Sequence, residues 1–385
     1  MTLLVELARR AAAHPHAATV VKRTAALQNG QGEPIEVPIW GVVIVYLTIL
    51  AGSIAFSLVS YMLNEVITTL CMVESLTAAI TVTPSAQEPS AKEGEKENLL
   101  EAGPTIALVN QKPITSSIRG TIRHLVDNAG RGARFRGYRI HIVYSVLSSI
   151  IVTFLNGALA KVPGQAILSA AISGALLARL HATWTHRVVG MPTEKPFCKR
   201  IPARSHWKTL AGPAAIAAAM PYISLYLTAG VAMLLFKSAG QDTTTTSTCA
   251  QRMGAIARAL GVVIFAITCT LFLCLPATVT LARIEASILP EDEDTIVPFD
   301  RTFGGKVVNK MMGGTGVVGF LDAWRSFTWE ARRRLIKLLA KNFFLVTSLL
   351  LVILHVLAFE AFIIMGPAIG KFMAEVKHDH MTNGA

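Results

Sequence analysis

Six long stretches without a charged side chain are the feature that most constrains this sequence. Each has, or comes close to, the roughly 17–25 apolar residues needed to cross the core of a bilayer. Of the 385 residues, 52% are hydrophobic and only 16% are charged, which is too apolar for a soluble two-domain protein. We therefore predict an all-α integral membrane protein. Its six transmembrane helices are expected at 39–63, 142–160, 162–178, 210–236, 259–282 and 342–359.

Positive charge collects in three of the polar connections. The formal net charge is +12, and most of the 36 Lys and Arg residues lie in 72–139, 179–208 and 283–341. If every apolar stretch spans the membrane once, these connections share one side, and both termini are expected on the other. A basic surface of this kind suits anionic lipid, cardiolipin included.

A short segment that occurs three times predicts an internal repeat. Residues 69–75, 176–182 and 280–286 align without a gap at intervals of about 100 residues. Each lies at the end of an apolar stretch and precedes a polar connection, which predicts three repeats of two spans. Amphipathic patterns at 114–128 and 320–327 predict short surface helices in the connections. The expected parts are a basic N-terminal tail (1–37), a first repeat (38–161, with a disordered loop at 83–113), a second (162–238), a third (239–366) and a C-terminal tail (367–385).

This layout resembles the mitochondrial carrier family, whose members have three tandem repeats of two spans. Residues 130–137 match that family's Gly-x4-aromatic-[Lys/Arg]-Gly signature and end in Phe135-Arg136-Gly137. The loops also resemble those of fungal membrane proteins of unassigned function. The resemblance implies a transporter of an unidentified small solute in a mitochondrial membrane, the inner in preference to the outer. The basic, acid-poor residues 1–32 fit a mitochondrial targeting segment, or equally a solvated tail.

The chain departs from the carrier pattern at the positions that form ion pairs in that family. Carriers close one side of the pore with a ring of acidic and basic residues, whereas the basic positions here hold Leu70, Leu177 and Leu281. Three leucines at equivalent repeat positions predict an apolar plug on a common axis, unless they are ordinary core or lipid-facing residues. The acidic positions are also lost, so we expect no ring of ion pairs.

Charged and polar residues one turn beyond the leucines are candidates for a second cluster around the axis. Charges at the edge of a span usually face a cavity or the headgroups. Arg179–Glu285 and Arg283–Glu74 are possible pairs, although the sequence does not orient them. The candidates are Glu74, Arg179, His181, Arg283 and Glu285.

A few titratable residues inside the apolar stretches are candidates for a cavity. His141 and Tyr144 lie in the second stretch, His355 in the sixth, and Glu360 directly after it. An acid at membrane depth is a functional hypothesis by default, whereas a lone His is more often a packing residue.

Signatures of catalysis are missing from the sequence. It has no phosphate-binding glycine loop, HExxH motif or nucleophile elbow, and the basic loops lack the aromatics of a nucleic-acid surface. We expect no enzyme, cofactor, metal site or nucleic-acid partner. A divergent carrier-like transporter is the first hypothesis. The alternatives are a degenerate carrier fold acting as a membrane scaffold, adaptor or insertion factor, and a six-span protein unrelated to carriers.

Overall fold

The computed structural model describes residues 39–75, 78–82, 106–110, 113–193, 201–237, 249–290, 292–307 and 316–382. Within these residues, six helices are long and apolar enough to cross a membrane. The prediction of an all-α membrane protein with six transmembrane helices is therefore confirmed. The candidate spans are Ile39–Val73, Arg131–Ala158, Gln165–Val189, Arg204–Phe236, Met253–Ser287 and Trp329–Ile364.

The chain divides into two compact units, which are described separately. The larger comprises Leu58–Leu345, and the smaller comprises Met1–Ser57 with Val346–Ala385. Helices α3 (Ile39–Ser60) and α13 (Trp329–Thr382) each contribute to both. The division does not follow the expected repeat boundaries, so the three-repeat arrangement stays a prediction.

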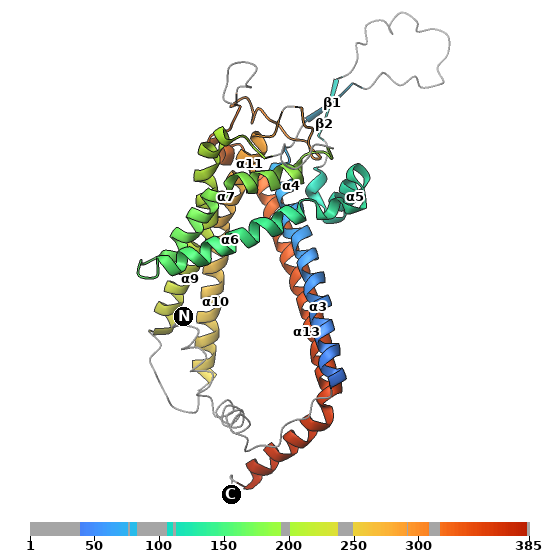
Figure 1. Cartoon of the computed structure of the whole chain (residues 1–385), viewed down its shortest axis with the longest axis vertical. Helices are drawn as coiled ribbons and strands as arrows, with labels where there is room; N and C mark the ends of the chain where they lie inside the picture. Colours follow the sequence, from blue (N-terminus) through green and yellow to red (C-terminus); the bar gives the residue numbers. More distant parts are fainter. Residues whose placement is uncertain are drawn as a thin grey trace, which may run out of the picture. The chain divides into compact units, whose positions relative to one another are not determined.

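In the smaller unit, α3 packs closely against α13 (Figure 1). A Cβ atom placed on Gly41 would lie 2.5 Å from Cγ2 of Ile364, so a larger residue would require Ile364 to shift. The Thr48 hydroxyl donates a 2.7 Å hydrogen bond to Oε1 of Glu360. Small residues at the contact and an interhelical hydrogen bond are the usual means by which membrane helices associate.

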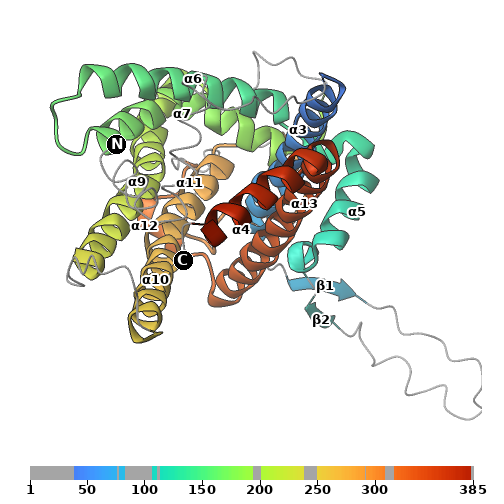
Figure 2. The same ribbon diagram turned by 90° about the horizontal axis from the view of Figure 1, so that it is seen from below.

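The larger unit contains the remaining long helices. The α6 and α7 helices form a hairpin, α9 packs against α7, and α10 packs against α9 (Figures 1 and 2). The hydroxyls of Ser148 and Ser173 lie 3.0 Å apart and link the two arms of the hairpin. The elements are α6 (Tyr138–Ala158), α7 (Gln165–Val189), α9 (Trp207–Lys237), α10 (Cys249–Cys269), a π-helical segment η6 (Thr270–Cys274) and α11 (Leu275–Ser287).

The first span ends in the larger unit with a second π-helical segment. The α3 helix continues through η1 (Tyr61–Ile67) into α4 (Thr68–Val73). The Leu63 carbonyl accepts hydrogen bonds from Nδ2 of Asn342 at 2.7 Å and from the Thr68 hydroxyl at 2.9 Å. These side chains satisfy the backbone carbonyl at the wide turn. Without them the carbonyl would lack a hydrogen bond, which costs free energy in a bilayer interior.

The connections contain short elements. Strands β1 (Ala78–Val82) and β2 (Ile106–Asn110) pair antiparallel. Strand β2 lies inside the loop 83–113 that was expected to be disordered, so that expectation is wrong for 106–110. Residues 83–105 of the loop lie outside the described residues. The first surface helix begins later than expected, because Ser117 caps it by accepting from the Gly120 amide at 3.0 Å. The expected C-terminal tail continues α13 to Thr382. The other elements are η3 (Ile114–Ser116), α5 (Ile118–Ala129), η4 (Arg131–Phe135), η5 (Arg204–His206) and α12 (Phe320–Arg325).

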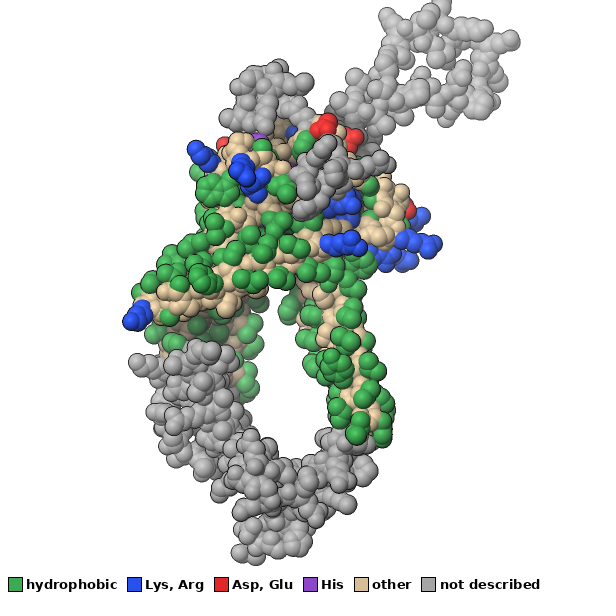
Figure 3. Space-filling model, in the orientation of Figure 1, with side chains coloured by type: hydrophobic (Ala, Val, Ile, Leu, Met, Phe, Trp, Pro, Cys, Tyr) green, Lys and Arg blue, Asp and Glu red, His purple; other side chains and the backbone are tan. Residues whose placement is uncertain are grey.

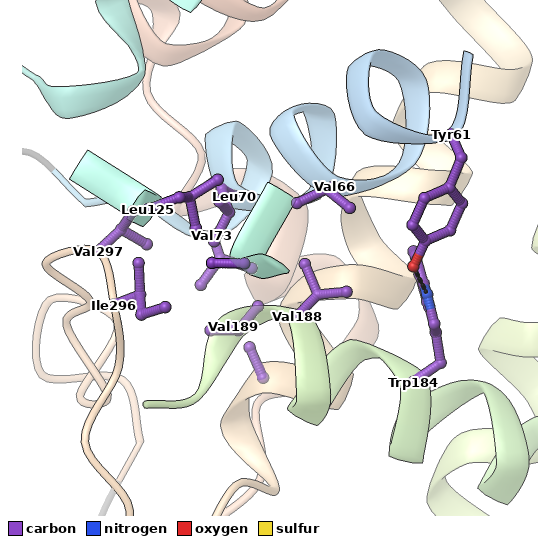
Figure 4. Packing of buried hydrophobic residues seen from close by; sticks show 12 residues of the cluster. Tyr61, Val66, Leu70, Val73, Leu125, Trp184, Val188, Val189, Ile296 and Val297 are labelled. Atoms are coloured by element: carbon purple, nitrogen blue, oxygen red, sulfur yellow. Dashed lines mark hydrogen bonds between the residues drawn. The ribbon is translucent and has the colours of Figure 1, made fainter. Parts of the chain in front are cut away.

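Two clusters of buried apolar side chains hold the larger unit together. The first joins η1, α4, α5 and α7 to the loop after α11, and includes Val66, Val188 and Ile296 (Figure 4). The second joins α7, α9, α11 and α12, and includes Ala178 and Leu210. The buried ends of α7 and α11 take part in both, so these helices organise the unit.

The contact between α7 and α9 generates a test of the packing. A Cβ atom on Gly174 would lie 2.6 Å from the Ala214 carbonyl oxygen and 2.7 Å from Cβ of Ala218. Gly174→Ala should therefore destabilise the protein, by about 1–3 kcal/mol for an overpacked contact. Gly212→Ala on α9 is the matched control, because no atom lies within 4 Å and alanine favours the helix by about 0.5–1 kcal/mol. Thermal midpoints in detergent check this, and equal effects of the two changes would contradict the packing.

Candidate functional site

A cavity of about 370 Å³, lined by both polar and apolar side chains, lies among the membrane spans of the larger unit. Its volume falls at the small end of the roughly 300–1,000 Å³ typical of small-molecule sites. Polar side chains come from η1, α4, α6, α7, η6 and α11, whereas α9 contributes only alanines. The lining includes Asn64, Glu65, Thr68, Thr69, Tyr144, His181, Trp184, Thr185, Ala214, Ala217, Ala218, Thr270, Cys274, Thr278, Leu281 and Leu339.

Both π-helical segments border this cavity. The η1 segment supplies Asn64 and Glu65, and η6 supplies Thr270 and Cys274. A π-helical turn widens a helix locally and is found frequently at functional sites. Two such turns, far apart in the sequence, therefore meet at one cavity.

Glu65 is the carboxylate that faces the cavity. It is half-buried, and within the described residues no hydrogen bond or ion pair engages its side chain. The described lining contains no Lys or Arg. A carboxylate within a membrane span is costly and usually faces a cavity or a partner charge. Glu65 faces a cavity.

A second carboxylate lies behind the wall of the cavity. Oε1 of Glu285 lies 2.7 Å from Nδ1 of His181, and the Thr185 hydroxyl donates to Oε2 at 2.5 Å. The Glu285 side chain is fully buried, whereas that of His181 is 23% exposed. His181 therefore lies between the buried carboxylate and the cavity.

Aromatic rings continue from His181 along one wall. The His181 ring lies 5.1 Å from Tyr144 and 5.2 Å from Trp184, and the Trp184 ring lies 5.9 Å from His141. The Trp184 indole donates a 2.9 Å hydrogen bond to the Tyr61 hydroxyl (Figure 4). These contacts hold Trp184 and Tyr144 in place at the cavity.

Glu74, which the sequence places near the axis, instead joins two connections. Its carboxylate accepts from the Ile114 amide at 2.6 Å and from the amide and hydroxyl of Thr115. Nη1 of Arg334 lies 3.2 Å away, and the two side chains are only 1% and 11% exposed. Glu74 is therefore a buried brace between the end of the first span and the start of the last.

Arg283 is a second brace, and its described hydrogen bonds go to backbone carbonyls and a hydroxyl. Its guanidinium donates to the Ala323 carbonyl at 3.1 Å, the Met72 carbonyl at 3.3 Å and the Ser326 hydroxyl at 3.1 Å. Its Cζ also lies 5.0 Å from the centre of the Phe303 ring and 5.5 Å from that of Phe327. These contacts link the exit of the first span to α11 and α12.

The possible ion pairs Arg179–Glu285 and Arg283–Glu74 are absent among these described residues. Nε of Arg179 donates to the Pro202 carbonyl at 2.9 Å, and Glu285 is bound by His181 and Thr185. Of the predicted polar cluster, Glu74, Arg283 and Glu285 lie near helix ends, whereas α7 continues to Val189, so Arg179 and His181 lie inside it. Only His181 and Glu285 come together.

The leucines of the predicted plug do not share one cluster. Leu70 is fully buried in the first apolar cluster, Leu281 is buried in the second and also lines the cavity, and Leu177 is half-buried and belongs to neither. The leucines therefore do not carry the functional argument below, and the plug stays a prediction.

The other cavity candidates fall into two groups. Tyr144 lines the cavity, and His141 packs behind it between Tyr61 and Trp184. His355 and Glu360 belong to the smaller unit, where the exposed His355 contacts its own helix at the Leu351 carbonyl. They are not part of the site in the larger unit.

The loop after α11 is held by a charged turn outside the spans. Asp300 accepts from the amide and hydroxyl of Thr302 and from the Gly304 amide, at 2.6–2.9 Å. Partial burial raises the pKa of Asp300, but these hydrogen bonds and the nearby Arg283 charge outweigh it and keep the pKa below its usual range. Its own amide donates to the Ser75 hydroxyl at 2.7 Å, which ties the loop to the exit of the first span.

Glu65, Trp184 and Arg334 were missed by reasoning from the sequence. Glu65 follows the first uncharged stretch by two residues and was not among the candidates, although α3, η1 and α4 run on without a break to Val73. The signal that would have found it is the length of that helix. Trp184 and Arg334 have no comparable signal, because their partners lie 123 and 260 residues away.

Comparison of the chain with protein-family models, curated proteins and solved structures found no match. Among the described residues, no group of three or more His, Cys, Asp or Glu side chains could hold a metal ion. The cavity and its charges are therefore the features of the described residues that point to a function.

The partners of Glu74 and Arg283 predict which charges are energetically coupled. Arg334→Met should lower the free energy of unfolding strongly, by about 3–5 kcal/mol for a buried pair, because it leaves Glu74 unpaired. Glu74→Gln in the same chain should restore part of the loss, with a coupling of about 0.5–3 kcal/mol. The control cycle, Arg283→Met with Glu74→Gln, should be additive. Unfolding in detergent micelles measures both cycles, and coupling in the control alone would contradict these contacts.

Proposed function

We propose that this protein is a solute transporter and that the cavity in the larger unit is its solute site. The single observation that carries the proposal is a cavity of about 370 Å³ among membrane spans that holds a carboxylate, Glu65, to which no described residue makes a hydrogen bond or ion pair. Burial of such a group in a static scaffold would cost stability and contribute nothing. A site that alternately takes up and releases a solute gives the carboxylate a role.

The two π-helical turns support the same proposal. They place Glu65 and Thr270 at the cavity on separate spans. A wide turn exposes backbone groups that side chains such as Asn342 must satisfy, so it persists only where the surroundings maintain it. We propose that these turns are the points at which the spans adjust around the solute.

We further propose that the transporter is a divergent relative of the mitochondrial carriers, in a mitochondrial membrane and preferably the inner one. The supporting observations are the repeated segments and the carrier-like signature at 130–137. Basic side chains gather at α5 and η4, whereas apolar side chains cover α6 (Figure 3). Anionic lipid such as cardiolipin is the partner proposed for this surface. Its exposed residues include Arg119, Arg123, Arg131 and Arg139.

A scaffold, adaptor or insertion factor is the second candidate, and a specific observation favours it. Glu74 and Arg283 brace the ends of the spans through buried contacts, which suit a permanent closure better than a gate. Under this alternative the cavity would be a packing defect. The two candidates differ in whether occupying the cavity changes solute flux.

Filling the cavity separates these alternatives. Thr278 lines the cavity, and Thr268 lies exposed on the same span; each hydroxyl donates to a carbonyl of its own helix. Thr278→Phe should abolish uptake into proteoliposomes, while Thr268→Phe should keep it near the wild-type rate. The measurement is uptake of labelled amino acids, carboxylates, nucleotides, choline and polyamines. Wild-type protein that moves none of these classes, or equal uptake by both variants, would contradict transport through this cavity.

A further inference from the structure

We propose that the solute is a small organic cation, with Glu65 as its counter-charge. The inference rests on the proposed transport function and names the class of solute that the cavity would take. It starts from the sign of the charge on the lining. The described lining residues include one carboxylate, Glu65, and no Lys or Arg.

The histidine in the wall does not reverse this sign. His181 is joined to Glu285 at 2.7 Å. With His181 protonated, the pair is neutral; with His181 neutral, the pair carries one negative charge. The net charge of Glu65, Glu285 and His181 is negative in both states, so these groups attract cations and repel anions. This holds although the whole chain carries a net charge of +12.

The remaining lining favours an organic cation over a bare metal ion. The rings of Tyr144 and Trp184 border the cavity, and aromatic faces attract ammonium groups when water is excluded. Ala214, Ala217 and Ala218 supply an apolar surface for alkyl groups. A transition metal ion would instead need several His, Cys, Asp or Glu ligands, and the described residues contain no group of three or more of these. One carboxylate, aromatic rings and small apolar side chains together match an alkylammonium group.

Cys274 offers a probe inside the cavity. It lines the space, and it is half-buried, whereas Cys71 and Cys269 are buried. In a chain that keeps Cys274 alone, with Cys71→Ala, Cys269→Ala, Cys198→Ser and Cys249→Ser, methanethiosulfonate reagents report which charge enters. The two probes are a cationic reagent that carries a trimethylammonium group and an anionic reagent that carries a sulfonate group. Each labelling rate is divided by the rate of the same reagent with free 2-mercaptoethanol.

The expected result is a normalised rate about tenfold or more higher for the cationic reagent, in membranes without a potential. Tetramethylammonium chloride should slow labelling, and sodium methanesulfonate should not. Glu65→Gln should bring the ratio close to one and remove the protection. Glu330→Gln, at an exposed position outside the cavity, should change neither the ratio of labelling rates nor the protection by tetramethylammonium. A thermal midpoint for Glu65→Gln near that of its parent shows that the fold is retained.

Two outcomes overturn the inference in distinguishable ways. Equal normalised rates, or a ratio that Glu65→Gln does not change, contradict a cation site and leave transport of another solute class standing. A Cys274 that neither reagent labels from either side of the membrane shows a cavity closed to water. That result contradicts the proposed transport function, and the cation inference with it.

Discussion

The structure depends on how charges are satisfied where water is scarce. A bilayer interior offers no hydrogen bonds, so each buried polar group needs a partner within the protein. Glu74 finds Arg334 and the start of η3, Arg283 finds backbone carbonyls and two aromatic rings, and Glu285 finds His181 and Thr185. Because every one of these contacts joins segments far apart in the sequence, together they fix the helix ends of the larger unit.

Glu65 stands apart from these braces, and the contrast gives it functional meaning. Glu74, Arg283 and Glu285 each make structural contacts within the protein. The Glu65 side chain instead faces a cavity at a π-helical turn. Glu285 is bound by protein groups and is a structural carboxylate. Glu65 faces the cavity and is accessible to a ligand there. The charges at the helix ends thus act as braces, whereas Glu65 is the carboxylate for which we propose a role in solute binding.

The sequence predicts the spans well and the contacts poorly, for a physical reason. Apolar length is a local property, so the six spans follow directly from the uncharged stretches. Side-chain partners depend on which helices meet: Thr48 and Glu360 are 312 residues apart, and Arg334 bonds the Glu74 backbone across 260. The π-helical turns at Tyr61–Ile67 and Thr270–Cys274 have no periodic signature, and the first of them contains Glu65. Pattern analysis therefore placed His181 and Glu285 at a helix exit, and only the fold shows that they face each other.

The most direct test of the central claim is a cryo-electron microscopy map of the full chain in lipid nanodiscs, recorded with tetramethylammonium and without it. The account predicts a hydrated space between Glu65, Tyr144 and Trp184, and additional density beside the Glu65 carboxylate when the cation is present. A lipid tail filling this space, or a Lys or Arg side chain in contact with Glu65, would contradict the account.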